Sequence, residues 1–238
     1  MKSRQQIKAL ARSAVSAQNG TSILLVLIST VASFAIGMTS GMLDSITMMA
    51  FGQGVAYYLV YWIGYFVITG VSYVIMINLL GEFIKVYKRQ KADIGELFLG
   101  FKTNFLRKVG GMLWMQLWIG LWSLLFIIPG IIKALAYYFT PNVLADCPNV
   151  TARQALKVSM KITKGYKGDV FMFILSWIGW MLLSILTCGI LWIVYVGPYF
   201  YAADAGFYLE LKEKALADGK ITPEELGMKK PKAKSKKK

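Results

Sequence analysis

The sequence contains no histidine and only two cysteines among its 238 residues. Histidine is the commonest general base and metal ligand near neutral pH, so its absence argues against zinc sites, haem ligation and catalytic triads of the usual kinds. Cys147 and Cys188 are read as small apolar residues without redox chemistry. No cofactor and no metal are therefore expected.

Charged residues are also scarce: they make up 16% of the chain, whereas hydrophobic residues make up 56%. A soluble domain of this length would have too little polar surface to face water. The apolar residues gather in blocks of about 20, the length that crosses ~30 Å of hydrocarbon. Residues 1–19 lack the apolar stretch and cleavage site of a signal peptide, so the first block is expected to remain as an anchor. The predicted fold class is an all-α, polytopic membrane helical bundle.

Six apolar runs are candidates for transmembrane helices. They are Thr21–Met42, Val55–Leu80, Val109–Ile128, Ile131–Ala145, Val170–Thr187 and Ile190–Leu209. The fourth run is short and contains Lys133 and Pro141, although a terminal lysine can reach the interface and membrane helices tolerate proline. Six spans are predicted, and a five-span alternative leaves residues 131–145 re-entrant.

Lysine and arginine are concentrated before the first run and in the loops after the second and fourth runs. The opposite connections, around residues 44–54, 129–130 and 188–189, contain neither, and Lys133 is the only cation near that face. Positive loops stay in the cytoplasm, so both termini are predicted to be cytoplasmic. Cys147 and Cys188 then lie on opposite membrane sides, which excludes a disulfide between them within the chain.

A shift of 59 residues aligns the third and fourth runs with the fifth and sixth. Trp118-Ile119-Gly120 matches Trp177-Ile178-Gly179, Gly130-Ile131 matches Gly189-Ile190, and Lys102 and Lys108 match Lys161 and Lys167. With one residue of slippage, Pro141 and Asp146 correspond to Pro198 and Asp204. Both copies would be hairpins of the same orientation, so the repeat is parallel and gives no support to alternating access by inverted repeats. The spans are predicted to form three hairpins.

Each hairpin is preceded by a stretch with helical periodicity. The apolar face of the first stretch comprises Ile7, Leu10, Ala11, Ala14 and Val15, and that of the second comprises Ile94, Leu97, Phe98, Phe101 and Phe105. The third predicted helix starts at Thr151, which forms a capping-box pattern with Gln154, and ends near Gly165. These cytoplasmic helices either lie in the plane of an anionic inner leaflet or pack on the inner end of the bundle. Candidate contacts with anionic lipid are Lys8, Arg12, Lys102, Arg107, Lys108, Lys157, Lys161, Lys164, Lys167, Lys236, Lys237 and Lys238.

The chain divides into a six-span domain, residues 1–211, and a cytoplasmic tail, residues 212–238. Thr222-Pro223-Glu224-Glu225 is a further helix-start signal, and residues 228–238 include seven lysines. A segment of that composition is expected to be disordered from about residue 228. This lysine-rich segment either binds an anionic lipid surface or is a solvated tail without a specific partner. Because it has no interleaved aromatic residues, we expect no specific nucleic-acid partner.

Polar side chains inside the membrane are candidates for function. Asp204 lies about two-thirds along the sixth run, and Asn78, Gln116 and Asn142 also fall at membrane depth. Pro141 and Pro198 are candidate helix kinks. The four polar side chains either make hydrogen bonds between helices, worth about 0.6 kcal/mol each, or line a path for protons, ions or substrate. Asp146, Asp169 and Glu82 are expected at the interface.

Several segments together resemble a bacterial integral-membrane family called domain of unknown function 975, over roughly residues 1 to 215. They are Pro129-Gly130-Ile131-Ile132-Lys133-Ala134, Ala145-Asp146-Cys147-Pro148, Ala155-Leu156-Lys157-Val158-Ser159, Lys164-Gly165-Tyr166-Lys167 and Ile178-Gly179-Trp180. The lysine-rich tail lies outside the resemblance. The resemblance implies a bacterial cytoplasmic-membrane protein and supplies no catalytic residues.

No phosphate-binding loop, dinucleotide fingerprint or nucleophile elbow occurs in the sequence. The expected function is therefore that of a non-enzymatic membrane protein that acts through lipids, a membrane protein partner or its own oligomer. The alternative is a small transporter or channel with a polar pathway near Asp204. An enzyme acting on lipid or peptide would need a carboxylate cluster at one membrane depth.

Overall fold

A computed structural model describes residues 2–99, 101–102 and 104–228, and these residues form helices and no strands. In chain order the elements are α1 (Arg4–Ala17), α2 (Asn19–Phe51), α3 (Val55–Tyr87), α4 (Glu96–Leu99), α5 (Phe105–Leu125), α6 (Ile127–Tyr137), α7 (Thr140–Asp146), α8 (Ala152–Thr163), α9 (Lys167–Leu175), α10 (Ile178–Leu186), the π-helical segment η1 (Trp192–Val196) and α11 (Gly197–Ala217). The all-α prediction is confirmed for the described residues.

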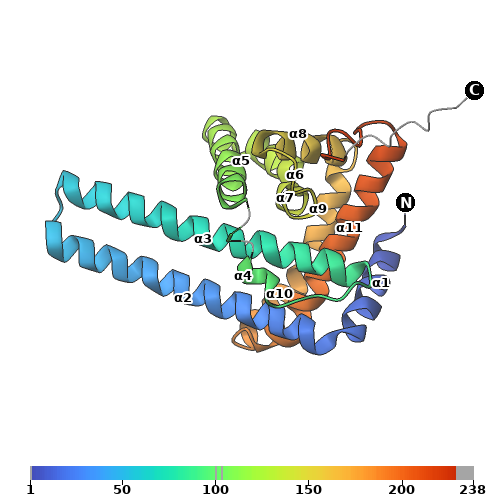
Figure 1. Ribbon diagram of the computed structural model, residues 1–238, viewed down its shortest axis with the longest axis horizontal. Coiled ribbons are helices and arrows are strands. Elements are labelled where there is room, and N and C mark those ends of the chain that lie inside the picture. Colours follow the sequence, from blue (N-terminus) through green and yellow to red (C-terminus); the bar gives the residue numbers. More distant parts are fainter. Residues whose placement is uncertain (1, 100, 103, 229–238) are drawn as a thin grey trace, which may run out of the picture.

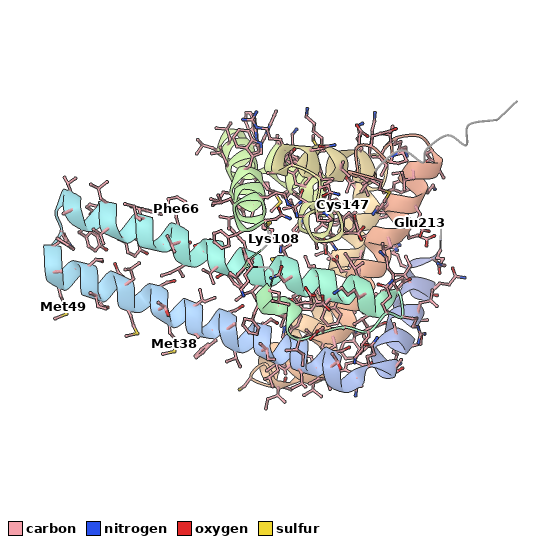
Figure 2. The ribbon with its side chains drawn as sticks, viewed as in Figure 1. Met38, Met49, Phe66, Lys108, Cys147 and Glu213 are labelled. Atoms are coloured by element: carbon pink, nitrogen blue, oxygen red, sulfur yellow. The ribbon has the colours of Figure 1, made fainter. Side chains whose placement is uncertain are left out.

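The helices α2 and α3 form a long hairpin that projects away from the other elements (Figure 1). Each has 33 residues, and at 1.5 Å per residue such a helix is about 50 Å long. Large apolar side chains are exposed along the distal part of the hairpin; Met38, Met49 and Phe66 are labelled in Figure 2, and Met49 is 89% exposed. Water is a poor solvent for such a surface, whereas hydrocarbon is a good one.

Four helical segments are long and apolar enough to cross a membrane: Asn19–Phe51, Val55–Tyr87, Ile127–Asp146 and Lys167–Leu186. They contain the first, second and short fourth apolar runs, and the fifth run except its last residue, Thr187. These segments indicate a membrane protein. The third and sixth runs, in α5 and in η1 with α11, are not among the four, and α11 crosses α3 steeply in Figure 1. Six spans in three hairpins therefore remain a prediction.

The base of the α2–α3 hairpin is surrounded by the remaining helices. The helix α1 begins with a capping box, in which Ser3 Oγ accepts from the Gln6 amide at 3.2 Å and Gln6 Oε1 accepts from the Ser3 amide at 2.8 Å. Its buried residues are Ile7, Ala11, Ala14 and Val15, and the helix packs against α11 and α3. The apolar face of α1 thus packs within the protein, and only Leu10 of the predicted face is exposed.

The helix α8 starts and ends where the sequence predicts. Thr151 Oγ1 accepts from the Gln154 amide at 3.3 Å, and the helix stops before Gly165, which has a φ of +89°. On its buried face, Ser159 Oγ and Thr163 Oγ1 both donate to the Ala136 carbonyl, at 3.0 and 3.1 Å. These two bonds hold α8 against α6.

The second predicted helix, over residues 94–105, is reduced to the single turn of α4. Asp93 Oδ1 accepts from the Gly95 amide at 2.8 Å, and Asn104 has a left-handed φ of +58°. Such a local side-chain bond competes with helical hydrogen bonding, and a left-handed residue cannot continue a right-handed helix. Leu97 is buried, but Phe98 and Leu99 are exposed.

Both prolines proposed as kinks lie where a helix is interrupted. The helix α6 ends at Tyr137 and α7 begins at Thr140, with Pro141 in its first turn. Pro198 occupies the first turn of α11, directly after the π-helical segment η1. Proline lacks an amide hydrogen and clashes with the preceding turn, which explains the change of backbone geometry at both places.

The helix α11 continues beyond residue 211 to Ala217, and the chain then folds back to α8. Ile221 and Leu226 are buried. The start signal at Thr222 forms its reciprocal bonds, with the Thr222 amide donating to Glu225 Oε2 at 3.2 Å and the Glu225 amide to Thr222 Oγ1 at 3.3 Å, but it leads into a turn. The disorder predicted from about residue 228 concerns residues 229–238, which lie outside the described part.

Candidate functional site

Two helical segments meet through a row of polar side chains, here called the polar ladder. One side comprises Tyr138, Asn142 and Asp146, and the other comprises Asp204, Tyr208 and Lys212 of α11. Within each set the residues are four positions apart, a spacing that places side chains on one face of a helix, as for Asn142 and Asp146 on α7. Tyr138 lies in the turn just before α7. Each side therefore presents one polar stripe to its neighbour.

The contacts of the ladder are specific. Tyr138 Oη donates to Asp204 Oδ1 at 2.8 Å, and Asn142 Nδ2 donates to Asp204 Oδ2 at 2.8 Å. Tyr208 Oη donates to Asp146 Oδ2 at 3.2 Å, and Lys212 Nζ forms an ion pair with the same carboxylate. Each aspartate is thus bound by side chains of the facing segment.

The order of these contacts shows that the two segments run in the same direction. Asp204 bonds to the earlier residues Tyr138 and Asn142, whereas the later Tyr208 and Lys212 bond to the later Asp146. The self-alignment of the sequence pairs Pro141 and Asp146 with Pro198 and Asp204. The ladder therefore joins the two segments that the sequence relates by a parallel repeat.

Asp204 is 4% exposed, and both of its carboxylate oxygens accept a hydrogen bond. A buried carboxylate is costly unless its oxygens are bonded, so these partners account for its presence. Of the two roles considered for the polar residues predicted at membrane depth, the contacts of Asp204 are hydrogen bonds between helical segments.

A polar cleft of about 340 Å³ lies beside the ladder, between α3, α4, α5 and α7. Its polar lining comprises Asn78, Glu82, Lys85, Lys88, Gln90, Glu96, Lys108 and Asp146. Lys88 Nζ donates to Asp146 Oδ1 at 3.2 Å, and Lys85 Nζ donates to Glu82 Oε1 at 2.7 Å. Asp146 connects the cleft to the ladder because its second oxygen accepts from Tyr208 and Lys212.

The four polar residues predicted at membrane depth fall into three places. Asn142 and Asp204 meet in the ladder. Asn78 lines the cleft; its Nδ2 donates to the Leu97 carbonyl at 2.7 Å and its Oδ1 accepts from Lys108 Nζ at 2.5 Å. Gln116 is exposed on α5. A single polar pathway through all four is therefore not formed.

Some of the cations proposed as lipid contacts are turned into the protein. Arg107 donates to the carbonyls of Leu144 at 2.8 Å, Cys147 at 3.0 Å and Val150 at 2.8 Å, so it caps the end of α7. Figure 2 labels Lys108 and Cys147 among the inward-lying side chains, and Lys108 is buried. Arg107 and Lys108 therefore hold α5 to its neighbours.

Other predicted lipid contacts have partners near the surface. Lys161 Nζ pairs with Glu225 Oε1 at 2.5 Å, and this hydrogen bond lowers the pKa of Glu225. Lys8 Nζ donates to Ser176 Oγ at 2.8 Å and lies 4.5 Å from the centroid of the Trp177 ring. Burial lowers the pKa of Lys8, and the neighbouring Arg4 lowers it further.

The remaining predicted contacts lie at or near the protein surface. Arg12 lies 6.0 Å from the centroid of the Tyr195 ring. Lys102, Lys157 and Lys164 are exposed, and Lys167 is half-buried. Lys236, Lys237 and Lys238 lie outside the described residues.

Sequence reasoning missed part of the ladder. Asp146 is predicted at the interface, whereas its fellow ladder residues Tyr138, Tyr208 and Lys212 are not predicted as site residues. The four-residue spacing within each set was the available signal, but it does not identify the facing residues. Among residues 2–99, 101–102 and 104–228, no group of three acidic or cysteine side chains is placed to hold a metal ion.

The family described as "Protein of unknown function (DUF975)" matches residues 1–136 and 124–215. No curated protein and no solved structure matches the chain. The two family matches cover the chain continuously from α1 to Ala215 in the last turn of α11, including every residue of the ladder and the cleft. The chain therefore belongs to the family described as Protein of unknown function (DUF975).

Proposed function

We propose that the protein is a non-enzymatic, multi-pass protein of the bacterial cytoplasmic membrane that acts through its contacts with membrane lipids. The observation that carries this proposal is the uncovered apolar surface of the α2–α3 hairpin, which adjoins a base rich in lysine and arginine. In this proposal both termini lie on the cytoplasmic side. The polar ladder fixes the base, since its two carboxylates are engaged by the facing helices.

The apolar hairpin surface fits the hydrocarbon layer of a bilayer leaflet, and the basic surface of the base fits its headgroup layer. The distal hairpin exposes Phe34, Met42, Ile46 and Leu59, and burial of apolar area in hydrocarbon is favourable by roughly 25 cal/mol per Å². Exposed cations of the base, such as Lys102, would lie at the headgroups. An anionic leaflet attracts each surface cation by about 1 kcal/mol. Anionic lipid should therefore stabilise the folded protein.

The test reconstitutes the full-length protein in nanodiscs of phosphatidylcholine alone and of phosphatidylcholine with phosphatidylglycerol. Ligands that bind the folded state raise the unfolding temperature. We expect the anionic discs to raise it by about 4 °C or more, and 0.5 M salt to reduce the difference because it screens exposed charges. Equal unfolding temperatures in the two kinds of disc would contradict the proposal.

The alternative is a small transporter or channel, and the polar cleft is the observation that favours it. The cleft reaches Asp146, which follows Asn142, a partner of Asp204, by one turn of α7. This alternative predicts a proton or ion flux in proteoliposomes that Asp204→Asn abolishes while the fold is preserved. Asp169→Asn, a carboxylate outside the ladder, is the matched control. A wild-type protein without flux, or an Asp204→Asn variant with normal flux, would exclude the alternative.

A further inference from the structure

We propose that a groove between α5, α6 and α8 binds one anionic phospholipid, with its phosphate at Arg153 and Lys157. The groove has a volume of about 610 Å³, within the range of about 300–1,000 Å³ that is typical of ligand sites. The inference rests on the proposed function, because it assigns the lipid contact to one place. We call this site the tryptophan groove; its main residues are Trp114, Trp118, Trp122, Lys133, Arg153 and Lys157.

Each of the three helices contributes one face to the groove. Trp114, Trp118 and Trp122 are four residues apart and share one side of α5. By the same spacing, Arg153 and Lys157 share one side of α8, and Lys133 lies on the groove side of α6. The helices α5, α6 and α8 contact one another pairwise, so the three faces form one concave surface.

The charge of the groove is of one sign. Its lining contains three cations and no acidic residue. The Arg153 guanidinium lies 4.9 Å from the centroid of the Trp114 ring, and Lys133 Nζ lies 4.8 Å from that of Trp122. In the part of the chain that the structure describes, neither cation has an acidic partner, in contrast to Lys161 and Lys88.

This arrangement favours a phosphate ester over other ligands. Aromatic rings attract a cation without using its N–H groups, so the donors of Arg153 are available to phosphate oxygens beside Lys157. The positive charge disfavours a quaternary ammonium group in the same place. Basic pockets between membrane helices on the cytoplasmic side are a known type of lipid-headgroup site.

The walls of the groove favour a lipid over a free phosphate. Tryptophan rings suit the boundary between headgroup and hydrocarbon because one edge is polar and the body is apolar. Leu117 and Leu121 of the same helix α5 are exposed. They extend an apolar surface from the groove, along which acyl chains can lie.

The experiment titrates the detergent-solubilised full-length protein with phosphatidylglycerol and with phosphatidylcholine, and counts bound lipid by native mass spectrometry. The variant Arg153→Gln/Lys157→Gln removes two charges from the groove. The control Arg4→Gln/Lys91→Gln removes two exposed charges outside the groove, at positions that were not predicted as lipid contacts. We expect the groove variant to lose about tenfold in phosphatidylglycerol affinity and the control less than about twofold, because two cations then no longer face the phosphate.

Trp118→Leu is a second variant that keeps all charges and should weaken phosphatidylglycerol binding about threefold, since the amphipathic ring at the boundary between headgroup and hydrocarbon is lost. Circular dichroism checks the fold of each variant. If the double variant does not fold, the affinity of Trp118→Leu alone tests the proposal. An unchanged affinity in Trp118→Leu would overturn the proposal.

The remaining outcomes separate the groove from the general function. Equal losses in the groove and control variants would overturn the groove but leave a general attraction to anionic lipid. A wild-type protein without preference for phosphatidylglycerol would contradict the proposed function itself. Displacement of phosphatidylglycerol by millimolar glycerol phosphate would show a site for free phosphate and overturn the lipid assignment.

Discussion

Asn142 and Gln116 are two amide side chains that the sequence predicts at membrane depth, yet their surroundings differ. Asn142 is 2% exposed and donates to Asp204, whereas Gln116 is exposed on α5. The difference arises from the facing helix, because α11 brings Asp204 to within 2.8 Å of the Asn142 amide. An amide in a sequence becomes structurally important only through such a partner.

This contrast gives a prediction at the residue scale. Asn142→Leu leaves one buried oxygen of Asp204 without its donor, and an unsatisfied buried polar group costs about 1–3 kcal/mol. We expect the free energy of unfolding in detergent to fall by that amount. Gln116→Leu, the matched control, should change it by less than about 0.5 kcal/mol. Equal effects of the two substitutions would show that the ladder bond contributes little to stability.

The sequence identified Asp204 and Asn142 but not their relation. A polar residue within an apolar run is conspicuous, so each of the two is identified individually. The distance between α7 and α11 depends on tertiary packing, which a period of four residues does not encode. Lys212 was therefore missed, although it pairs with Asp146 and lies on the same face as Asp204.

At the scale of elements, the turn between α5 and α6 depends on close packing at Gly130. A Cβ at this position would lie 2.2 Å from Ser123 Oγ and 2.8 Å from Ser123 Cα. Gly120, in the same hairpin, has no atom within 4 Å of such a Cβ. The two glycines therefore have opposite requirements although both are helical.

We predict that Gly130→Ala lowers the free energy of unfolding by about 1–3 kcal/mol, because the added methyl forces the backbone of α5 away. Gly120→Ala should leave stability unchanged or raise it by about 0.5–1 kcal/mol, as alanine favours the helix. Thermal unfolding of both variants in the same detergent measures the difference. A stable Gly130→Ala variant would show that the hairpin can open at no cost.

Capping and periodicity signals in the sequence predicted a helix correctly where both indicated the same boundaries. Thr151 caps α8 as its spacing to Gln154 indicates, and the helix ends before Gly165. In residues 94–105 the helical period was present, but the turn at Asp93 and the left-handed Asn104 prevail over it. Helical periodicity alone does not account for such backbone preferences.

At the scale of the whole molecule, the four apolar segments and the family match are established, whereas the membrane topology is the central proposal. The charge distribution predicts that the turn of α2–α3 and the turn after α10 face one side, and that α8 faces the other. Gln53 and Cys188 are exposed in those turns, and Lys164 is exposed at the end of α8. These three positions report directly on the topology.

The most direct test is thiol labelling in intact cells with a membrane-impermeant maleimide. Three single-cysteine proteins are compared: Cys188 alone in a Cys147→Ser background, and Gln53→Cys or Lys164→Cys with both native cysteines replaced by serine. The proposed topology predicts that Gln53→Cys and Cys188 are labelled in intact cells and that Lys164→Cys is labelled only after permeabilisation. Labelling of Lys164→Cys in intact cells, or protection of Gln53→Cys, would contradict it.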